Sequence, residues 1–383
     1  MTRNDPIYLD ANATTPLHPT VVEVMRPWVS EEFGNPSSSH PAGRRAAQAV
    51  NNARGQVAAL LNARPEEIVF TGGGSEANNL ALKGVAWGRR ERGRHLIISG
   101  VEHPAVREPS RFLEREGWAV SVLPVDGCGR VDPQDVADAL RPDTVLVSVM
   151  HANNETGSLN PLAEVATLCR ERGVLVHTDA AQSVGKIPVN TEGLEVDLVT
   201  LAGHKLHGPK GVGALYVRDG LELEPLIHGA GHEQGRRAGT ENVAGVVGLG
   251  AACRWAHTEG LVTYAEAVRE RRDRIHELLA AALPGLALNG HPEERLPNTL
   301  NVSIPGVLGR EVLAACPEVA ASTGSACHED ADYPSEVLMA MGLSKDRALG
   351  SMRLSLSLLT GDEDVERAAA ALAAAARSVG FQA

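Results

Sequence analysis

The sequence predicts an α/β protein in which a mainly parallel sheet of seven strands is covered by helices, followed by a smaller α+β domain. Short apolar runs alternate with helical patterns between residues 42 and 217, which is typical of a parallel sheet covered on both faces. The pattern changes after about residue 256. The 383 residues are enough for two domains, and 43% hydrophobic with 22% charged residues is an ordinary globular balance.

The predicted elements follow in chain order. Residues 42–62 place apolar side chains on one helical face, and another helix is expected to begin near Glu76. A third helix is predicted at 162–172. The seven strands are expected at 68–70, 96–99, 120–123, 145–150, 175–178, 196–201 and 214–217.

The second region is predicted to contain a long charged helix at 264–282 and a closing alanine-rich helix at 362–377. Shorter strands are expected at 299–304 and 353–356. We expect a large domain at 15–258, and a small domain formed by residues 1–14 and 259–383.

Composition excludes several classes of protein. A net charge of −12 argues against direct, non-specific nucleic-acid binding. The N-terminus lacks an apolar signal segment, and the apolar run at 368–376 is too short to span a bilayer. The five cysteines form no C-x-x-C pair or metal-binding spacing, so we expect no disulfide framework, no metal site and a cytoplasmic location.

A lysine stands in an unusual setting at 201–211, LAGHKLHGPKG. An apolar strand leads into Lys205, and Gly208, Pro209 and Gly211 then turn the chain. A surface lysine needs no such setting, whereas a lysine that forms a covalent bond to a ligand does.

Two further motifs follow predicted strands. Gly72–Ser75 lies between a strand and a helix, where backbone N–H groups bind phosphate, although a plain turn explains it equally well. Asp179 ends the strand at 175–178; it is either a helix N-cap or the partner of a protonated ring nitrogen. Lys205 follows Asp179 by 26 positions (205 − 179), so both reach one crevice, and the three motifs together suggest pyridoxal phosphate.

At these motifs the chain resembles the cysteine desulfurases among the fold-type I pyridoxal-phosphate enzymes, from about residue 7 to residue 359. The matching stretches are YLDANATTP (8–16), GNPSSSH (34–40), FTGGGSEANN (70–79), VEH (101–103), NNETG (153–157), DAAQSVGK (179–186), GHKLHGPKG (203–211), RAGT (237–240) and STGSAC (322–327). The resemblance implies conversion of L-cysteine to L-alanine by a homodimer, with pyridoxal 5'-phosphate as cofactor.

The resemblance also implies roles for individual residues. Lys205 would form the Schiff base, and His103 would stack on the ring and move protons. Asp179 would pair with the ring nitrogen, and Gln182 would donate to the phenolic oxygen. The phosphate would be held by Gly74, Ser75, His204 and, across the dimer interface, Thr240. Asn154 and Arg353 would bind the substrate carboxylate.

Cys327 would take the persulfide and pass it to a sulfur-acceptor protein. Its neighbours at 322–326 are small and polar, whereas Cys128, Cys169, Cys253 and Cys316 suggest inert packing. The acidic run after Cys327 disfavours its thiolate.

Two residues depart from the family pattern. Ala202 replaces the usual serine before Gly-His-Lys, which removes one phosphate hydrogen bond. Ser357 replaces the usual glycine after Arg353.

Two other functions remain open at this point. The Cys327-His328 pair also resembles selenocysteine lyases, and a non-catalytic scaffold subunit is the third hypothesis, against which Lys205, Asp179 and Cys327 argue. The acceptor pathway is open between iron–sulfur cluster assembly, tRNA thiolation and DNA phosphorothioation, and the acidic run after Cys327 favours a specialised pathway such as DNA phosphorothioation.

Overall fold

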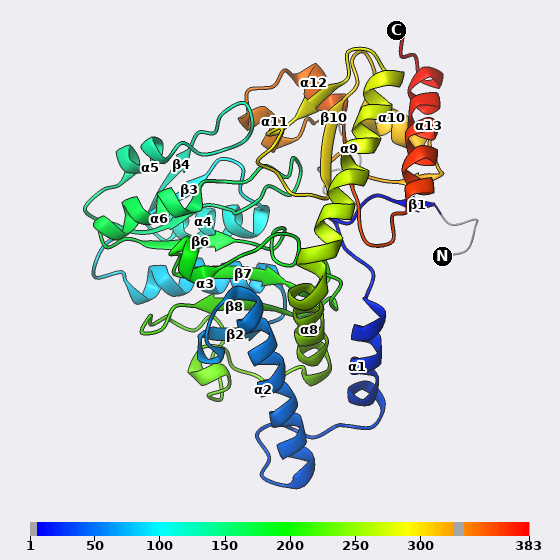
Figure 1. Ribbon diagram of the computed structural model, residues 1–383. Helices are drawn as coiled ribbons and strands as arrows, with labels where there is room; N and C mark the ends of the chain where they lie inside the picture. Colours follow the sequence, from blue (N-terminus) through cyan, green and yellow to red (C-terminus); the bar gives the residue numbers. More distant parts are fainter. Residues whose placement is uncertain (1–5, 325–332, 383) are drawn as a thin grey trace.

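The computed structural model describes residues 6–324 and 333–382. Its centre is a seven-stranded sheet in the order β2-β8-β7-β6-β5-β3-β4 (Figure 1). The strands are β2 (Ile68–Thr71), β3 (His95–Ser99), β4 (Ala119–Leu123), β5 (Thr144–Ser148), β6 (Leu175–Asp179), β7 (Leu198–Ala202) and β8 (Gly213–Val217). All seven predicted strands are present, with ends that differ from the expected ones by at most two residues.

The sheet is mainly parallel, as predicted. β3, β4, β5, β6 and β7 pair in parallel. β8 runs antiparallel to both of its neighbours, β2 and β7, so β2 points the same way as the parallel strands. The carboxyl ends of six strands therefore lie along one edge of the sheet.

Helices cover both faces of the sheet because successive strand residues point to opposite sides. Leu96 and Ile98 of β3 join a core formed with α3 (Gly74–Gly88) and α4 (Pro104–Arg115). Ile97, between them, joins the other core. That core includes residues of α2 (Pro41–Leu61), α6 (Leu162–Glu171) and α8 (Val243–Trp255).

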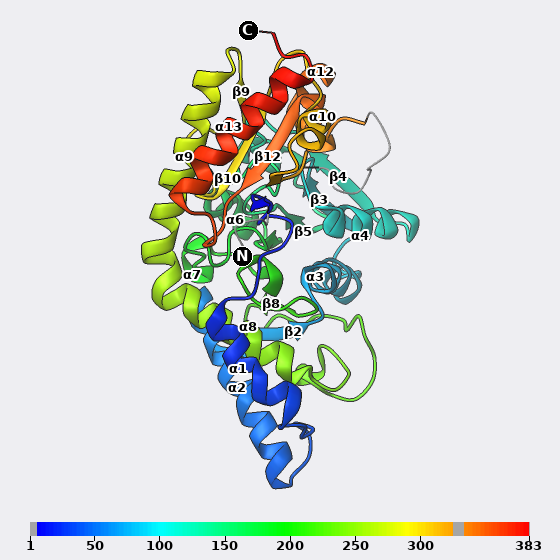
Figure 2. The same ribbon diagram turned by 90° about the vertical axis from the view of Figure 1, so that its right-hand side faces the viewer.

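The C-terminal part has its own three-stranded antiparallel sheet, in the order β12-β10-β9. Its strands are β9 (Ala287–Asn289), β10 (Thr299–Ser303) and β12 (Ser351–Ser355). Figure 2 shows α9 (Ala265–Ala282) and α13 (Asp362–Ser378) side by side against this sheet. The first strand returns to this part: β1 (Ile7–Tyr8) pairs with β11 (Val319–Ala320), and Ile7 and Leu9 join its core. The domain boundaries expected at 14/15 and 258/259 stay predictions.

Several shorter or less regular elements complete the chain. They are α1 (Pro19–Ser30), α5 (Pro133–Ala139), α7 (Thr191–Leu194), α10 (Gly309–Ala314), α11 (Glu336–Ala340) and α12 (Lys345–Leu349), the 3₁₀ turns η1 (Pro65–Glu67), η2 (Gly203–Lys205) and η3 (Glu233–Gly235), and the π-helical turn η4 (Ala256–Tyr264).

Candidate functional site

The predicted site residues gather at the carboxyl edge of the large sheet. Asp179 ends β6, and Lys205 follows β7 by three residues. His103 follows β3 and Asn154 follows β5. Because these strands are parallel, their ends meet at one crevice, which is where ligands bind in open α/β sheets.

Lys205 occupies the last position of η2, directly after β7. Its Nζ donates to the backbone carbonyls of Asn12 at 2.5 Å and of Ala13 at 2.8 Å. Burial lowers the pKa of this amine to about 8, and Arg353 acts in the same direction, while Asp179 and Asp10 oppose the shift. The unprotonated amine, which is the form that attacks an aldehyde, is therefore more populated near neutral pH than in an ordinary lysine.

Asp179 is a buried carboxylate, 6% exposed, at the end of β6. Its Oδ2 accepts from the Asn78 amide at 2.7 Å, and its Oδ1 accepts from the Ala181 backbone N–H at 3.0 Å. Among the described residues no lysine or arginine forms an ion pair with it. A buried carboxylate without a cation is costly, and a protonated ring nitrogen would supply the missing charge.

The glycine-rich loop leaves the N-terminus of α3 open. Gly73 has φ +145°, a conformation that side chains rarely adopt, and α3 begins at the next residue. The Gly72 N–H donates to Glu76 at 2.7 Å, and Glu76 accepts from Arg237 at 2.9 Å. The free N–H groups at the start of this helix, near Gly74 and Ser75, suit a phosphate.

Other residues expected at the phosphate lie around this loop. The ring of His204 is 3.2 Å from the Thr14 hydroxyl, and burial together with Lys205, Lys210 and Lys186 lowers its pKa to about 4. A Cβ at Gly74 would lie 3.2 Å from the Ala202 methyl group, so the site of the absent serine is close to the loop. Thr240 is exposed to solvent.

His103 caps α4 at the mouth of the crevice. Its Nδ1 accepts from the Ala105 N–H at 3.1 Å, so the proton of the neutral ring is on Nε2. Loss of water around the ring lowers the pKa of His103. Asp179 opposes this shift, whereas the cations Lys205 and Arg107 lower the pKa further. A neutral imidazole with Nε2 free is suited to moving protons.

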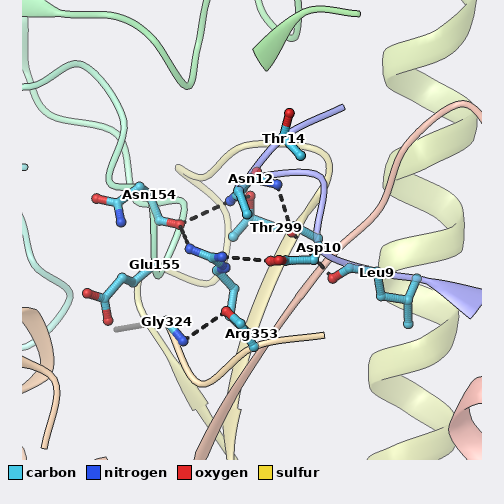
Figure 3. Close-up of polar contacts among 12 residues, drawn as sticks. Leu9, Asp10, Asn12, Thr14, Asn154, Glu155, Thr299, Gly324 and Arg353 are labelled. Carbon is cyan, nitrogen blue, oxygen red and sulfur yellow. Dashed lines mark hydrogen bonds and ion pairs between the residues drawn. The ribbon is translucent and has the colours of Figure 1, made fainter. Parts of the chain in front are cut away.

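Arg353 comes from β12, in the three-stranded sheet, and reaches the same crevice (Figure 3). Its Nη2 lies 2.7 Å from Asp10 Oδ1, and its Nη1 donates to the Asn154 carbonyl at 3.1 Å. Its buried Nε has no hydrogen-bond partner among residues 6–324 and 333–382. Figure 3 also shows the Asn154 side-chain amide pointing away from the guanidinium. The backbone of Asn154, and not its amide, therefore contacts Arg353 here.

Cys327 lies outside the described residues, so its predicted role is untested. Of the other cysteines, Cys169, Cys253 and Cys316 are buried, and burial raises the pKa of each thiol, that of Cys169 to about 12. Cys128 is half-buried, in contrast to the expected packing role, and its pKa is also raised by burial and by Asp126. None of these four thiols is activated for attack.

Sequence reasoning missed a group of residues that support the site from behind. The Asn12 carbonyl accepts from both Lys205 and Gln182, at 2.5 and 3.0 Å. Asn12 Oδ1 accepts from the buried Lys186 at 3.0 Å, and Asn78 holds Asp179. Asn12, Asn78 and Lys186 all fall inside the motifs YLDANATTP, FTGGGSEANN and DAAQSVGK, which was the available signal.

These features fit pyridoxal phosphate. The crevice offers an amine of lowered pKa, a buried carboxylate without a cation and an open helix N-terminus. The buried Asn78 Oδ1 and Thr178 Oγ1 also lack hydrogen-bond partners in the part of the chain that the structure describes. In the described part of the chain, no group of three or more His, Cys, Asp or Glu could hold a metal ion. No helix within residues 6–324 and 333–382 is long and apolar enough to cross a bilayer.

Comparison with known proteins identifies the family. Residues 7–368 match the aminotransferase class-V model. A cysteine desulfurase IscS of Dictyoglomus turgidum is 46% identical over 361 residues, 94% of this chain and 91% of that protein. A NifS-like protein of known structure shares 36% identity with a TM-score of 0.88, covering 96% of this chain and 98% of that one. The structure of SspA in complex with cysteine shares 39% identity with a TM-score of 0.82, covering 91% and 98%. The chain thus belongs to the class-V aminotransferase family and shares the fold of its NifS-like members.

Proposed function

We propose that this chain is a pyridoxal-phosphate-dependent L-cysteine desulfurase that leaves L-alanine and a persulfide on Cys327. One observation carries the proposal: Lys205 and the buried, cation-free Asp179 meet at one crevice. That crevice lies in a chain 46% identical to a cysteine desulfurase. When bound, the cofactor supplies an electron sink for negative charge at the substrate carbon.

The residues of the crevice divide into cofactor-binding and substrate-binding groups. Lys205 holds the cofactor covalently, and Asp179 keeps its ring nitrogen protonated. Gln182 donates to the phenolic oxygen. The phosphate is held by Gly74, Ser75, His204 and, from the partner subunit of a homodimer, Thr240. The open helix N-terminus and the exposed position of Thr240 support this arrangement.

Arg353 binds the substrate carboxylate, assisted by Asn154, and His103 moves protons at the reacting atoms. The unpartnered Nε of Arg353 supports this role, although Asp10 must share or release the guanidinium. The Asn154 amide must also turn toward the substrate from its position in Figure 3.

Cys327 performs the sulfur transfer. Its thiolate attacks the substrate sulfur, a sulfur–sulfur bond forms, and the carbon–sulfur bond breaks with its electron pair left on the substrate side. Protonation of that carbon then gives alanine. We further propose that a sulfur-acceptor protein removes the persulfide, and that the homodimer works in the cytoplasm without binding nucleic acid directly.

Replacing Lys205 by Ala tests the proposal. Lys205→Ala should abolish turnover of L-cysteine and the visible absorbance of the covalently held cofactor, because no other amine replaces it. Lys345→Ala, a change at an exposed lysine of α12, should alter neither. A variant at Lys205 that retained the absorbance would overturn the assignment.

Mass spectrometry tests the sulfur-transfer step separately. After incubation of the parent protein with L-cysteine and no reductant, an added sulfur is expected on the peptide that contains Cys327. A sulfur on Cys316 or Cys128 instead, with Cys327 unmodified, would contradict the mechanism. Loss of cysteine turnover in Cys327→Ser with retained selenocysteine turnover would favour a selenocysteine lyase.

A further inference from the structure

A second lysine, Lys186, is buried behind the crevice and has no role in the reaction described above. Lys186 lies in the turn after β6 and is 5% exposed. Its Nζ donates to Asn12 Oδ1 at 3.0 Å and to Gln182 Oε1 at 2.9 Å. Among the described residues no carboxylate pairs with it. A fully buried lysine without an anion is rare and needs an explanation.

The contacts of Lys186 match an uncharged amine. A neutral amino group has two N–H donors, and both are used, whereas an ammonium group would have a third donor with no acceptor in the described part of the chain. The charged and titratable groups around it are Lys205, Arg353, His204 and His207. Burial lowers the pKa of Lys186 well below its ordinary value, and the cations Lys205 and Arg353 add to this effect.

The neighbour whose orientation depends on Lys186 is Gln182. A glutamine amide can present either its oxygen or its nitrogen to a ligand. Here Lys186 donates to Oε1, while Nε2 donates to the Asn12 carbonyl at 3.0 Å. Turning the amide over would place an NH₂ group against the Lys186 donor and an oxygen against the Asn12 carbonyl. The network therefore permits one orientation of the Gln182 amide. In that orientation, one N–H of Nε2 donates to Asn12 and the second remains available to a ligand.

We propose that Lys186 is a positioning residue whose neutral amine fixes the Gln182 amide so that Nε2 donates to the phenolic oxygen of the cofactor. This inference rests on the proposed function, because it deepens the assignment of Gln182. A donor at the phenolic oxygen favours its ionised form. Lys186 would thereby set the pH at which the bound cofactor's visible absorbance changes, without touching the cofactor itself.

The test is a double-mutant cycle on the holoenzyme, read from visible absorbance as a function of pH. Lys186→Met keeps the length of the side chain and removes both donors. It should retain the visible absorbance and raise the pH midpoint by about 0.7 unit, the equivalent of one ordinary hydrogen bond. Gln182→Leu should raise the midpoint at least as much. Adding Lys186→Met to Gln182→Leu should then change it little, because the two residues act through one contact. Lys345→Met is the matched control and should leave the midpoint unchanged.

The outcomes separate this inference from the proposed function. No visible absorbance in the parent protein would mean that the proposed function fails. If the parent protein shows the absorbance, two results would overturn the role of Lys186 alone. One is that Lys186→Met shifts the pH midpoint equally in the parent and in Gln182→Leu. The other is that Lys186→Met does not shift the midpoint at all.

A second measurement covers the case in which Lys186→Met does not fold. In holoenzyme labelled with ¹⁵N at lysine Nζ, the Lys186 signal, assigned by comparison with Lys186→Gln, should be that of a neutral amine at pH 7. An ammonium signal at that pH would overturn the inference.

Discussion

Removing Arg54 should destabilise the protein strongly, because it leaves a buried carboxylate without its cation. Arg54 forms two 2.7 Å hydrogen bonds with Glu233, and their side chains are 13% and 3% exposed. Arg54 also donates to the Ile68 carbonyl at 2.6 Å and lies 4.7 Å from the centre of the Phe70 ring. In Arg54→Met, Glu233 would keep the Phe70 N–H as its donor, at 2.9 Å.

The expected cost follows from these contacts. Breaking a buried ion pair by removing one partner costs roughly 3–5 kcal/mol, and the lost contact with the aromatic ring adds about 0.5–1 kcal/mol. We therefore expect the free energy of unfolding to fall by about 4 kcal/mol. Cofactor retention should fall as well, because Glu233 anchors the segment whose Arg237 holds Glu76 beside the glycine-rich loop.

Urea unfolding of the holoenzyme, followed by tryptophan fluorescence, measures the change. Arg26→Met is the matched control, because the Arg26–Glu23 pair is 67% and 65% exposed and should be worth about 0–1 kcal/mol. The double variant Arg54→Met/Glu233→Leu should recover a large part of the loss, since no charge is left buried. If Arg54→Met were as stable as Arg26→Met, the reasoning about this ion pair would be refuted.

Four further predictions concern the crevice. Asp179→Ala should fold normally but lose at least about 100-fold in kcat, as expected when a charge partner of the transition state is removed; a wild-type rate would show that the cofactor is misplaced. Arg353→Met should raise KM for L-cysteine at least about tenfold, whereas an unchanged KM would remove it from the substrate site. Cys327→Ser should keep the visible absorbance of the cofactor and form no persulfide; persulfide elsewhere on the chain would contradict this. Burial raises the pKa of Glu102 to about 8, so the stability that it contributes is present below its unfolded pKa of about 4.3 and is lost as pH rises toward 8. Urea midpoints of Glu102→Gln should accordingly fall less between pH 5 and pH 8 than those of the parent, and an equal fall would show that this carboxyl does not titrate as described.

The large sheet could be predicted because its strands are buried on both faces. Runs such as residues 145–149 are apolar at nearly every position and are bounded by turns, so they stand out without any alternation. The helix α8 was missed for a related reason. Residues 245–253 of this helix are buried on all sides and include three glycines, so it shows neither a polar face nor high helix propensity. α1 was hidden by Pro27 within it.

The site could be predicted where chain order alone brings residues together. Asp179 and Lys205 follow neighbouring parallel strands, β6 and β7, so their proximity follows from topology. Asn12 and Arg353 reach the same crevice from the two ends of the chain, through tertiary packing that no local pattern encodes. The motif DAAQSVGK contains Lys186, but its contact with Asn12, 174 residues away, could not be predicted from any local pattern.

The dependence of the crevice on both ends of the chain has a consequence for biosynthesis. Leu9 and Ala11 bond to the backbone of the segments around Ala320 and Ser355, and the Asn12 N–H donates to the Ser355 hydroxyl at 2.9 Å. Asn12 is thus set in place by β12, a strand that the ribosome makes long after Asn12 itself. In a nascent chain whose large sheet has already formed, the Asn12 carbonyl that orients Lys205 would not yet be held in position. Loading of the cofactor should therefore follow synthesis of β12, and ribosome-bound fragments that end before residue 351 should remain colourless.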